Sequence, residues 1–214
     1  MNLPRRQFLS LGTLALAAPT LTRRAGAEEC TGTLSLHRGI AFRRKDGSRG
    51  LARQESDGAV VIDYITNQGE RTDRRRVVQG VFETWRLYAE SEFPVVGSAP
   101  PEWTWKFSPK PVMPEAGGGW KGKVAELRDE VGYGTNMKES HKRSRTSWTA
   151  EYRFLAREEV KISGCHFLIL PVEASFTGDL GTRSQRWLYF EQHGFGLETR
   201  RDGVGNGLTA LTPV

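Results

Sequence analysis

Alternating apolar and polar residues recur along most of the chain, with the two-residue period of a β-strand. In the first half, residues 60–64 place Val, Ile and Tyr on one face, and residues 102–107 read EWTWKF. Asp46-Gly47 and Asp57-Gly58 are turn signals because glycine tolerates a positive φ, and they bracket a predicted hairpin. No convincing amphipathic helix is present, although residues 123–130 are compatible with one or two helical turns.

The last third of the chain has the most regular pattern. Residues 152–162 predict one long strand, and residues 166–176 are apolar on both faces, which is typical of a central strand. Residues 186–192 and 195–201 then complete an antiparallel meander, whereas the proline-rich stretch 94–119 predicts long irregular connections. The predicted fold is therefore all-β: a strongly curved antiparallel sheet or open β-barrel, in a single domain with little helix.

The first 27 residues have the pattern of a cleaved export signal. An apolar stretch, Phe8–Leu21, follows a charged start and is too short to span a bilayer, which takes about 20 helical residues. Ala25-Gly26-Ala27 supplies the small residues of a cleavage site. The run Arg5-Arg6-Gln7-Phe8-Leu9 resembles the twin-arginine (Tat) consensus, although Pro4 stands where Ser or Thr is usual. An ordinary secretory signal is the alternative, and both predict a periplasmic protein without a permanent membrane anchor.

Removal of this signal changes the charge balance of the working domain, residues 28–214. The signal holds four of the 31 Lys and Arg residues and no acid, so 27 basic residues remain against 25 acidic ones. A net charge of +2 does not favour a nucleic-acid-binding role, which needs a strongly basic surface. The Tat translocase is the one protein partner that the sequence predicts.

Two cysteines, Cys30 and Cys165, remain after cleavage. In an oxidising periplasm they predict one disulfide that ties the N-terminus to a later strand, with two free thiols as the alternative. In the chain-entropy model such a bond stabilises the fold by roughly 5 kcal/mol at most. Cys30 is not predicted to carry a lipid, because Glu28-Glu29 precede it where small apolar residues are required.

The C-terminal part, about residues 150–202, carries a family resemblance. Its order is a long strand, then VKISGCHFLIL, then RWLYFEQHGFGLETR. This order resembles uncharacterised bacterial periplasmic β-meander proteins, which are similar in outline to the open barrels of lipoprotein carriers. The resemblance implies a curved antiparallel sheet and an apolar ligand. It transfers no catalytic residue.

The aromatic face of one short strand is the strongest candidate for a binding site. Trp103, Trp105 and Phe107 project from the same side of their strand, and Trp120 adds a fourth ring nearby. Large rings beside proline-rich loops either form a platform for sugars, line a cavity for an apolar ligand, or fill the core of a curved sheet.

The remaining motifs do not specify chemistry. The run Gly117–Val124 departs from a phosphate-binding loop, because valine stands where a hydroxyl is needed. The four histidines lack the spacing of a metal site, and Cys165 with a histidine is the only nameable nucleophile–base pair. We therefore assign no catalytic residue, metal or cofactor. Two basic clusters are solvated hairpin ends or a surface for anionic envelope material. One comprises Arg71, Arg74, Arg75 and Arg76, and the other Lys138, His141, Lys142, Arg143 and Arg145.

These observations predict a non-enzymatic periplasmic binding protein for an envelope lipid or other apolar small molecule. A periplasmic hydrolase acting on cell-wall sugar or lipid is one alternative. An interaction or assembly protein for another exported partner is the other.

Overall fold

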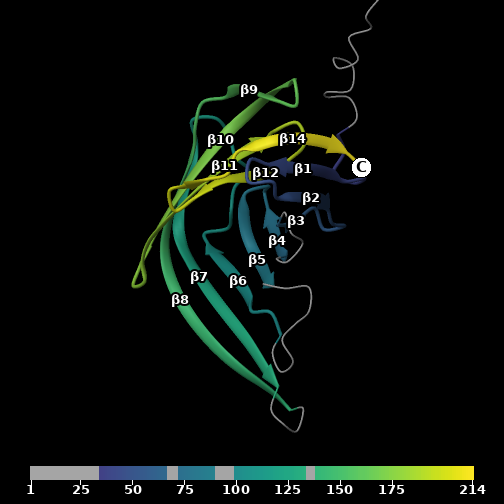
Figure 1. The fold of residues 1–214 in the computed structure, drawn as a ribbon. Helices are drawn as coiled ribbons and strands as arrows, with labels where there is room; N and C mark the ends of the chain where they lie inside the picture. The colour runs from purple at the N-terminus through teal and green to yellow at the C-terminus, as the bar shows by residue number, and fades with distance from the viewer. Residues whose placement is uncertain (1–33, 67–71, 90–98, 134–137) are drawn as a thin grey trace, which may run out of the picture.

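The computed structural model describes residues 34–66, 72–89, 99–133 and 138–214 (Figure 1). These residues contain no helix and form a single 14-stranded sheet in which all strand pairs are antiparallel. The all-β, antiparallel prediction is thus confirmed. The strands are β1 (Ile40–Arg44), β2 (Arg49–Gln54), β3 (Val60–Ile65), β4 (Thr72–Val78), β5 (Phe82–Ala89), β6 (Glu102–Ser108), β7 (Gly119–Tyr133), β8 (Glu139–Phe154), β9 (Glu158–Ile162), β10 (Cys165–Gly178), β11 (Gly181–Phe190), β12 (Phe195–Arg201), β13 (Val204–Gly205) and β14 (Leu208–Pro213).

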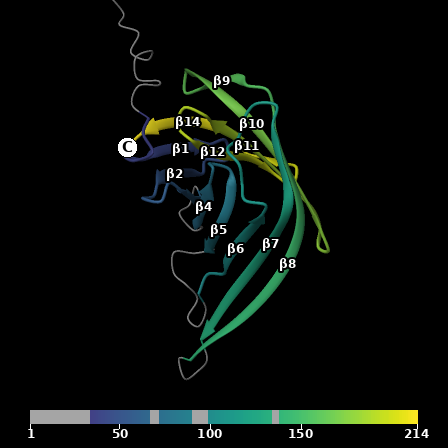
Figure 2. The same ribbon diagram turned by 180° about the vertical axis from the view of Figure 1, so that it is seen from behind.

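The sheet is open and strongly curved. Its strand order is β13-β12-β11-β10-β8-β7-β6-β5-β4-β3-β2-β1-β14, and β9 pairs with β10 beside this path. The two end strands of that order, β13 and β14, do not pair with each other. Figures 1 and 2 show β7 and β8 as a long curved wall, with β9–β12, β14 and β1 gathered at one end of it.

The predicted hairpin turns are present. Gly47 and Gly58 have φ values of +82° and +84°, and the Asp57 carboxylate accepts a hydrogen bond from the backbone N–H of Ala59 at 3.1 Å. β3, which follows the second turn, behaves as the alternation predicts, since every second residue of 60–64 is buried. The sequence Asn67-Gln68-Gly69 predicts a third turn, and these residues lie outside the described ones.

Two sequence predictions are corrected by the structure. Residues 123–130 form no helical turn but lie within β7, paired with β6 on one side and β8 on the other. The predicted long strand 152–162 is also interrupted: β8 ends at Phe154, and β9 starts at Glu158. The inward alternation resumes in the same phase after the break, with Phe154 and Ile162 both buried, so the pattern alone does not reveal it.

β10 is the central strand that the sequence predicts. Its first half pairs with β9, and its second half lies between β8 and β11. Ile169 and Leu170 are both fully buried although they are adjacent, because the inward-facing positions change parity between the two halves of the strand. This change explains why its sequence is apolar on both faces.

The concave side of the sheet encloses two apolar clusters. One cluster joins β1–β3 to β9, β12, β14 and the start of β10, and includes Ile40, Phe42, Ile62, Ile169, Phe195 and Leu197. The other joins β5, β7, β8, β10 and β11, and includes Phe82, Trp120, Val124, Trp148, Tyr152, Leu170 and Val172.

Candidate functional site

A row of rings follows the concave face of β6. Trp103, Trp105 and Phe107 are all half-buried and share one side of the strand, as predicted. Across the β6–β7 ladder they lie opposite Arg128, Glu126 and Val124, respectively. The row thus runs from the apolar core at Phe107 to charged surroundings at Trp103.

The inner end of the row is packed into the core. The Phe107 ring lies 5.5 Å from both Phe82 and Trp120, and Trp120 lies 5.7 Å from Tyr152. Trp120 is only 5% exposed, and its Nε1 donates a hydrogen bond to the carbonyl of Lys110 at 3.2 Å. The structure therefore gives Trp120 the packing role that the sequence left as an alternative.

The outer end of the row lies between two arginines. The guanidinium of Arg128 is 5.3 Å from the Trp103 ring centroid, and that of Arg86 is 5.8 Å away. Both distances allow a cation–π interaction. Trp103 therefore marks the point where the aromatic row becomes a polar surface.

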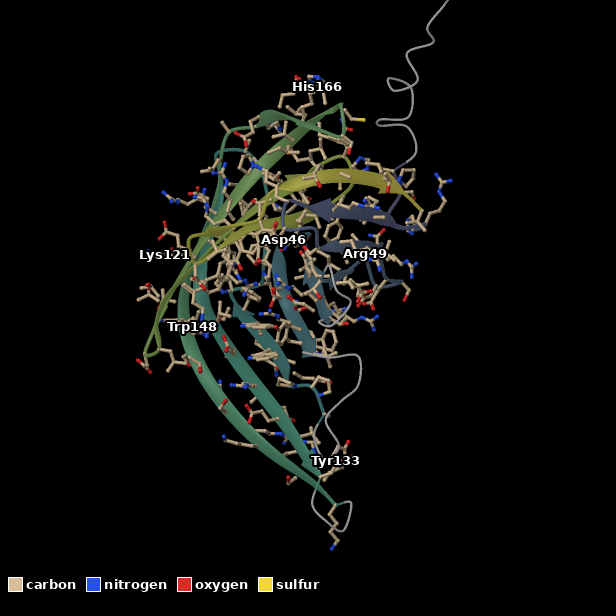
Figure 3. All side chains as sticks on the ribbon, in the orientation of Figure 1. Asp46, Arg49, Lys121, Tyr133, Trp148 and His166 are labelled. Carbon is tan, nitrogen blue, oxygen red and sulfur yellow. The ribbon has the colours of Figure 1, made fainter. Side chains whose placement is uncertain are left out.

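Between these ends lies a small open pocket of about 30 Å³, room for about one water molecule. Five rings and five polar side chains line it: Trp105, Phe107, Trp148, Tyr152, Phe176, Glu83, Glu126, Arg183, Gln185 and Arg201. It brings together Trp105 and Phe107, two of the four predicted ligand-binding residues. Trp148 lies midway along β8, on the inner side of the wall (Figure 3).

Glu126 organises one side of this pocket. Its Oε2 accepts hydrogen bonds from Trp105 Nε1 at 3.1 Å, Trp148 Nε1 at 3.0 Å and Arg183 at 2.8 Å. Arg183 also covers the Trp148 ring, 4.2 Å from its centroid. Glu126 is 6% exposed, so these three donors replace the water that a buried carboxylate loses.

A second charged group shares Glu83 and Arg201 with the pocket lining and lies where the curved sheet brings β4 and β12 together. Arg75 is 6% exposed and contacts Asp73 at 2.5 Å, Glu198 at 3.0 Å and Glu83 at 3.6 Å. Arg201 completes it, at 2.6 Å from Glu198 and 3.4 Å from Glu83.

This group of charges shifts the pKa values of its acids. Burial by itself would raise the pKa of Glu198, but Arg75 and Arg201 outweigh burial and lower it to about 2. Burial also opposes ionisation of Asp73, and Arg75 and Arg86 outweigh it, so the pKa of Asp73 lies well below its usual range. Glu198 and Asp73 are therefore ionised in the folded protein at neutral pH.

Sequence reasoning missed the polar half of the pocket. Glu83, Glu126, Arg183 and Arg201 come from four different strands, and no local motif connects them. One signal was present: in β7, Glu126 takes the inward-facing position next after Trp120, Gly122 and Val124. A charged residue at a strand position where the alternation places apolar residues indicates a buried polar site. Which side chains pair with that residue depends on the order of strands in the sheet.

Several other predictions fall on parts that the structure does not describe. Cys165 begins β10, but Cys30 lies outside the described residues, so their disulfide stays a prediction. The export signal lies outside them too. Within the described ranges, no group of three or more His, Cys, Asp or Glu side chains is arranged to hold a metal ion. The same residues include no helix of the length and apolarity that crossing a membrane requires.

Comparisons with known proteins identify no family. No protein-family model matches the chain, and no curated protein matches it either. Among solved structures, the hypothetical lipoprotein YmcC from Escherichia coli K12 is similar, with a TM-score of 0.41 and 10% sequence identity. The alignment covers 82% of this chain and 85% of that one. A likeness this distant does not bear on function.

Proposed function

We propose that the protein is a non-enzymatic binding protein that holds a neutral saccharide against Trp105 on the concave face of the sheet. The pocket is too small to enclose a sugar, so the observation that carries this proposal is the half-buried Trp105 ring at its open side, next to fixed Glu, Gln and Arg side chains. Sugars present both an apolar ring face and a rim of hydroxyl groups. The ring and its polar neighbours offer a partner to each of these surfaces.

Trp105 is the best-placed platform among the rings. It is half-buried on β6, and its Nε1 is fixed by Glu126, which sets the orientation of the ring. Arginine side chains already lie over Trp103 and Trp148. In the described part of the chain, no guanidinium lies over Trp105 and no other ring stacks on it. Its ring is therefore the one that a ligand can cover.

The lining of the pocket favours a sugar over an acyl chain. The sequence predicted an envelope lipid or other apolar ligand, which needs a long apolar cavity. Here the apolar interior is filled by two side-chain clusters, and half of the residues that line the pocket are charged or amide-bearing. An acyl chain in this place would leave those polar groups without partners, which is costly.

The pairing of the charges favours a neutral ligand. Arg183 is paired with Glu126, and Arg201 with Glu198 and Glu83. Because each of these arginines already has its own carboxylate, an anionic ligand would have to compete with Glu126 and Glu198. Hydroxyl groups need only share the remaining lone pairs and N–H donors.

The proposed site of action is the periplasm, which rests on the export signal. A signal of the Tat type predicts that replacing Arg5-Arg6 by two lysines leaves the full-length precursor in the cytoplasm. Immunoblots of cell fractions test this, with the unchanged signal as the control. Export of the lysine variant at the normal level would point to an ordinary secretory signal instead.

The binding test uses protein isolated from the periplasm and tryptophan fluorescence titrations. The probes are chitotetraose and maltotetraose as neutral oligosaccharides, with palmitate as the apolar comparison. Trp105→Ala should weaken oligosaccharide binding at least tenfold, about 1.4 kcal/mol, because the stacking surface is lost. Trp85→Ala is the matched control, since Trp85 is also half-buried but bonds Glu102 on the outer face.

Three outcomes would overturn the proposal. Equal losses of oligosaccharide affinity for Trp105→Ala and Trp85→Ala would show that the ligand does not bind at the concave face. Tight palmitate binding, or lipid in organic extracts of the isolated protein, would restore the apolar-ligand prediction. Hydrolysis of a bound oligosaccharide that stops in Glu126→Gln or Glu83→Gln would instead establish the hydrolase alternative.

A further inference from the structure

β8 has a long backbone edge that no strand of the described residues covers. Along one side it pairs with β7 over its whole length, from Arg153 to Glu139. On its other side β10 covers only Trp148–Phe154, because β10 and β11 turn back at Gly178 and Gly181. Within the described residues, 139–147 therefore have no neighbour on that side. Figure 1 shows β8 as the outermost strand below the β10–β11 turn.

This edge is accessible from both faces. Residues 139–145 are all exposed, whichever face of the sheet they point to. In an antiparallel strand, about every second residue directs its N–H and C=O toward the same neighbour. Half of this segment's backbone groups therefore point outward into solvent, which is the arrangement that an added strand recognises.

The side chains along the edge are predominantly basic. His141, Arg143 and Arg145 face outward on the convex side, and Lys142 lies on the concave side. Asp129 on β7 contacts His141 and Arg143, at 3.0 Å in each case. Arg145 has no acidic partner in the described part of the chain. Lys142 lies 3.8 Å from Glu130, and His141 lies 3.8 Å from Glu139. Among the described residues, Arg145 therefore supplies the unpaired positive charge that favours an acidic strand beside this edge.

The same charges disfavour a second copy of the chain. Two β8 edges paired antiparallel about Arg143 would place Arg143 against Arg143, and Arg145 against His141, of the other copy. Like charges on opposed strands destabilise a sheet, which is one way in which proteins protect exposed edges.

We infer that the uncovered edge of β8, residues 139–147, binds an extended acidic peptide segment of another protein by strand addition. Backbone hydrogen bonds supply the part of the affinity that does not depend on the peptide sequence. The basic side chains select acidic residues at alternate positions. This surface is separate from the saccharide pocket, since its outward side chains lie on the convex face. The protein would thus combine a ligand site with a protein-docking edge.

The test is fluorescence polarisation with a labelled nine-residue peptide of alternating threonine and glutamate. The comparison peptide has proline in place of threonine, which keeps the charges and removes half of the N–H donors. Arg145→Glu should weaken binding of the first peptide at least fivefold. Arg153→Glu is the matched control, because Arg153 is an exposed arginine on the convex side of β8 where β10 covers the edge.

Hydrogen–deuterium exchange locates the bound peptide. The expected result is slower exchange of amides within 139–147 when the threonine–glutamate peptide is added, and little binding of the proline peptide. Equal binding of both peptides would reduce the effect to charge attraction and overturn strand addition. Absence of binding would show that the basic residues only protect the edge. Dimers with protected 139–147 amides and no peptide would identify a second copy as the occupant.

Discussion

The carboxylate of Glu198 provides a quantitative test of the charged group inside the curved sheet. Glu198 is 6% exposed and lies 3.0 Å from Arg75 and 2.6 Å from Arg201. These arginines outweigh the effect of burial and lower its pKa from 4.5 to about 2. Because the folded-state pKa is depressed, the stabilisation is complete above the unfolded-state pKa and is lost as the pH falls toward the folded-state value.

The expected magnitude follows from the shift in the pKa. A difference of roughly 2.5 between the folded and unfolded values corresponds to about 3 kcal/mol at neutral pH. Glu198→Gln keeps the shape of the side chain but removes its charge, so it should lower the free energy of unfolding by about 3 kcal/mol at pH 7. Near pH 2.5 the carboxyl is almost fully protonated in the unfolded chain but only partly protonated in the folded protein. There, the difference between the two proteins should shrink to about 1 kcal/mol.

The assay is urea unfolding followed by tryptophan fluorescence at several pH values between 7 and 2.5. Glu151→Gln is the control, since Glu151 is 49% exposed, lies 3.5 Å from Lys121, and should change stability by about 0.5 kcal/mol or less. A destabilisation by Glu198→Gln that stayed constant with pH would refute the argument. The loss would then come from packing, without a contribution from charge.

Two further predictions concern the fold. Gly50→Ala should destabilise the protein by about 2 kcal/mol or more in thermal or urea unfolding, because a Cβ there would lie 2.2 Å from the Phe42 ring. Gly205→Ala, with nothing within 4 Å of the added Cβ, should be nearly neutral; equal effects would contradict the packing around Phe42. For the predicted disulfide, thiol labelling of the unfolded, unreduced protein should modify neither Cys30 nor Cys165. Labelling of both would show free thiols.

The fold could be predicted from the sequence where strand patterns are local. Alternation over 60–64 and the Asp-Gly turns indicate hairpins, because their strands pair with immediate sequence neighbours. The break between β8 and β9 was hidden because its cause is remote. The backbone N–H of Leu155 donates a hydrogen bond to the carbonyl of Pro171, at 2.9 Å. Pro171 lies in β10, where the inward-facing positions change from odd-numbered to even-numbered residues.

The candidate site was predictable only on its aromatic side. Trp105 and Phe107 share a face by strand periodicity alone, and this places both in the pocket. The partners of Glu126 could not be predicted in the same way. Arg183 reaches it from β11, two strands beyond β8 in the sheet order, so the contact depends on the curvature of the whole sheet.

The pairing of β1 with β14 constrains the order of events during folding. Phe42 lies opposite Leu211, so residues from both ends of the described chain complete one apolar cluster. Contacts of such high sequence separation raise the contact order and require a large loop to close before they add stability. The cluster cannot form on a ribosome that has not yet released residues near 211. The protein is therefore expected to complete this cluster only after residue 211 has left the ribosome, in one slow, late step.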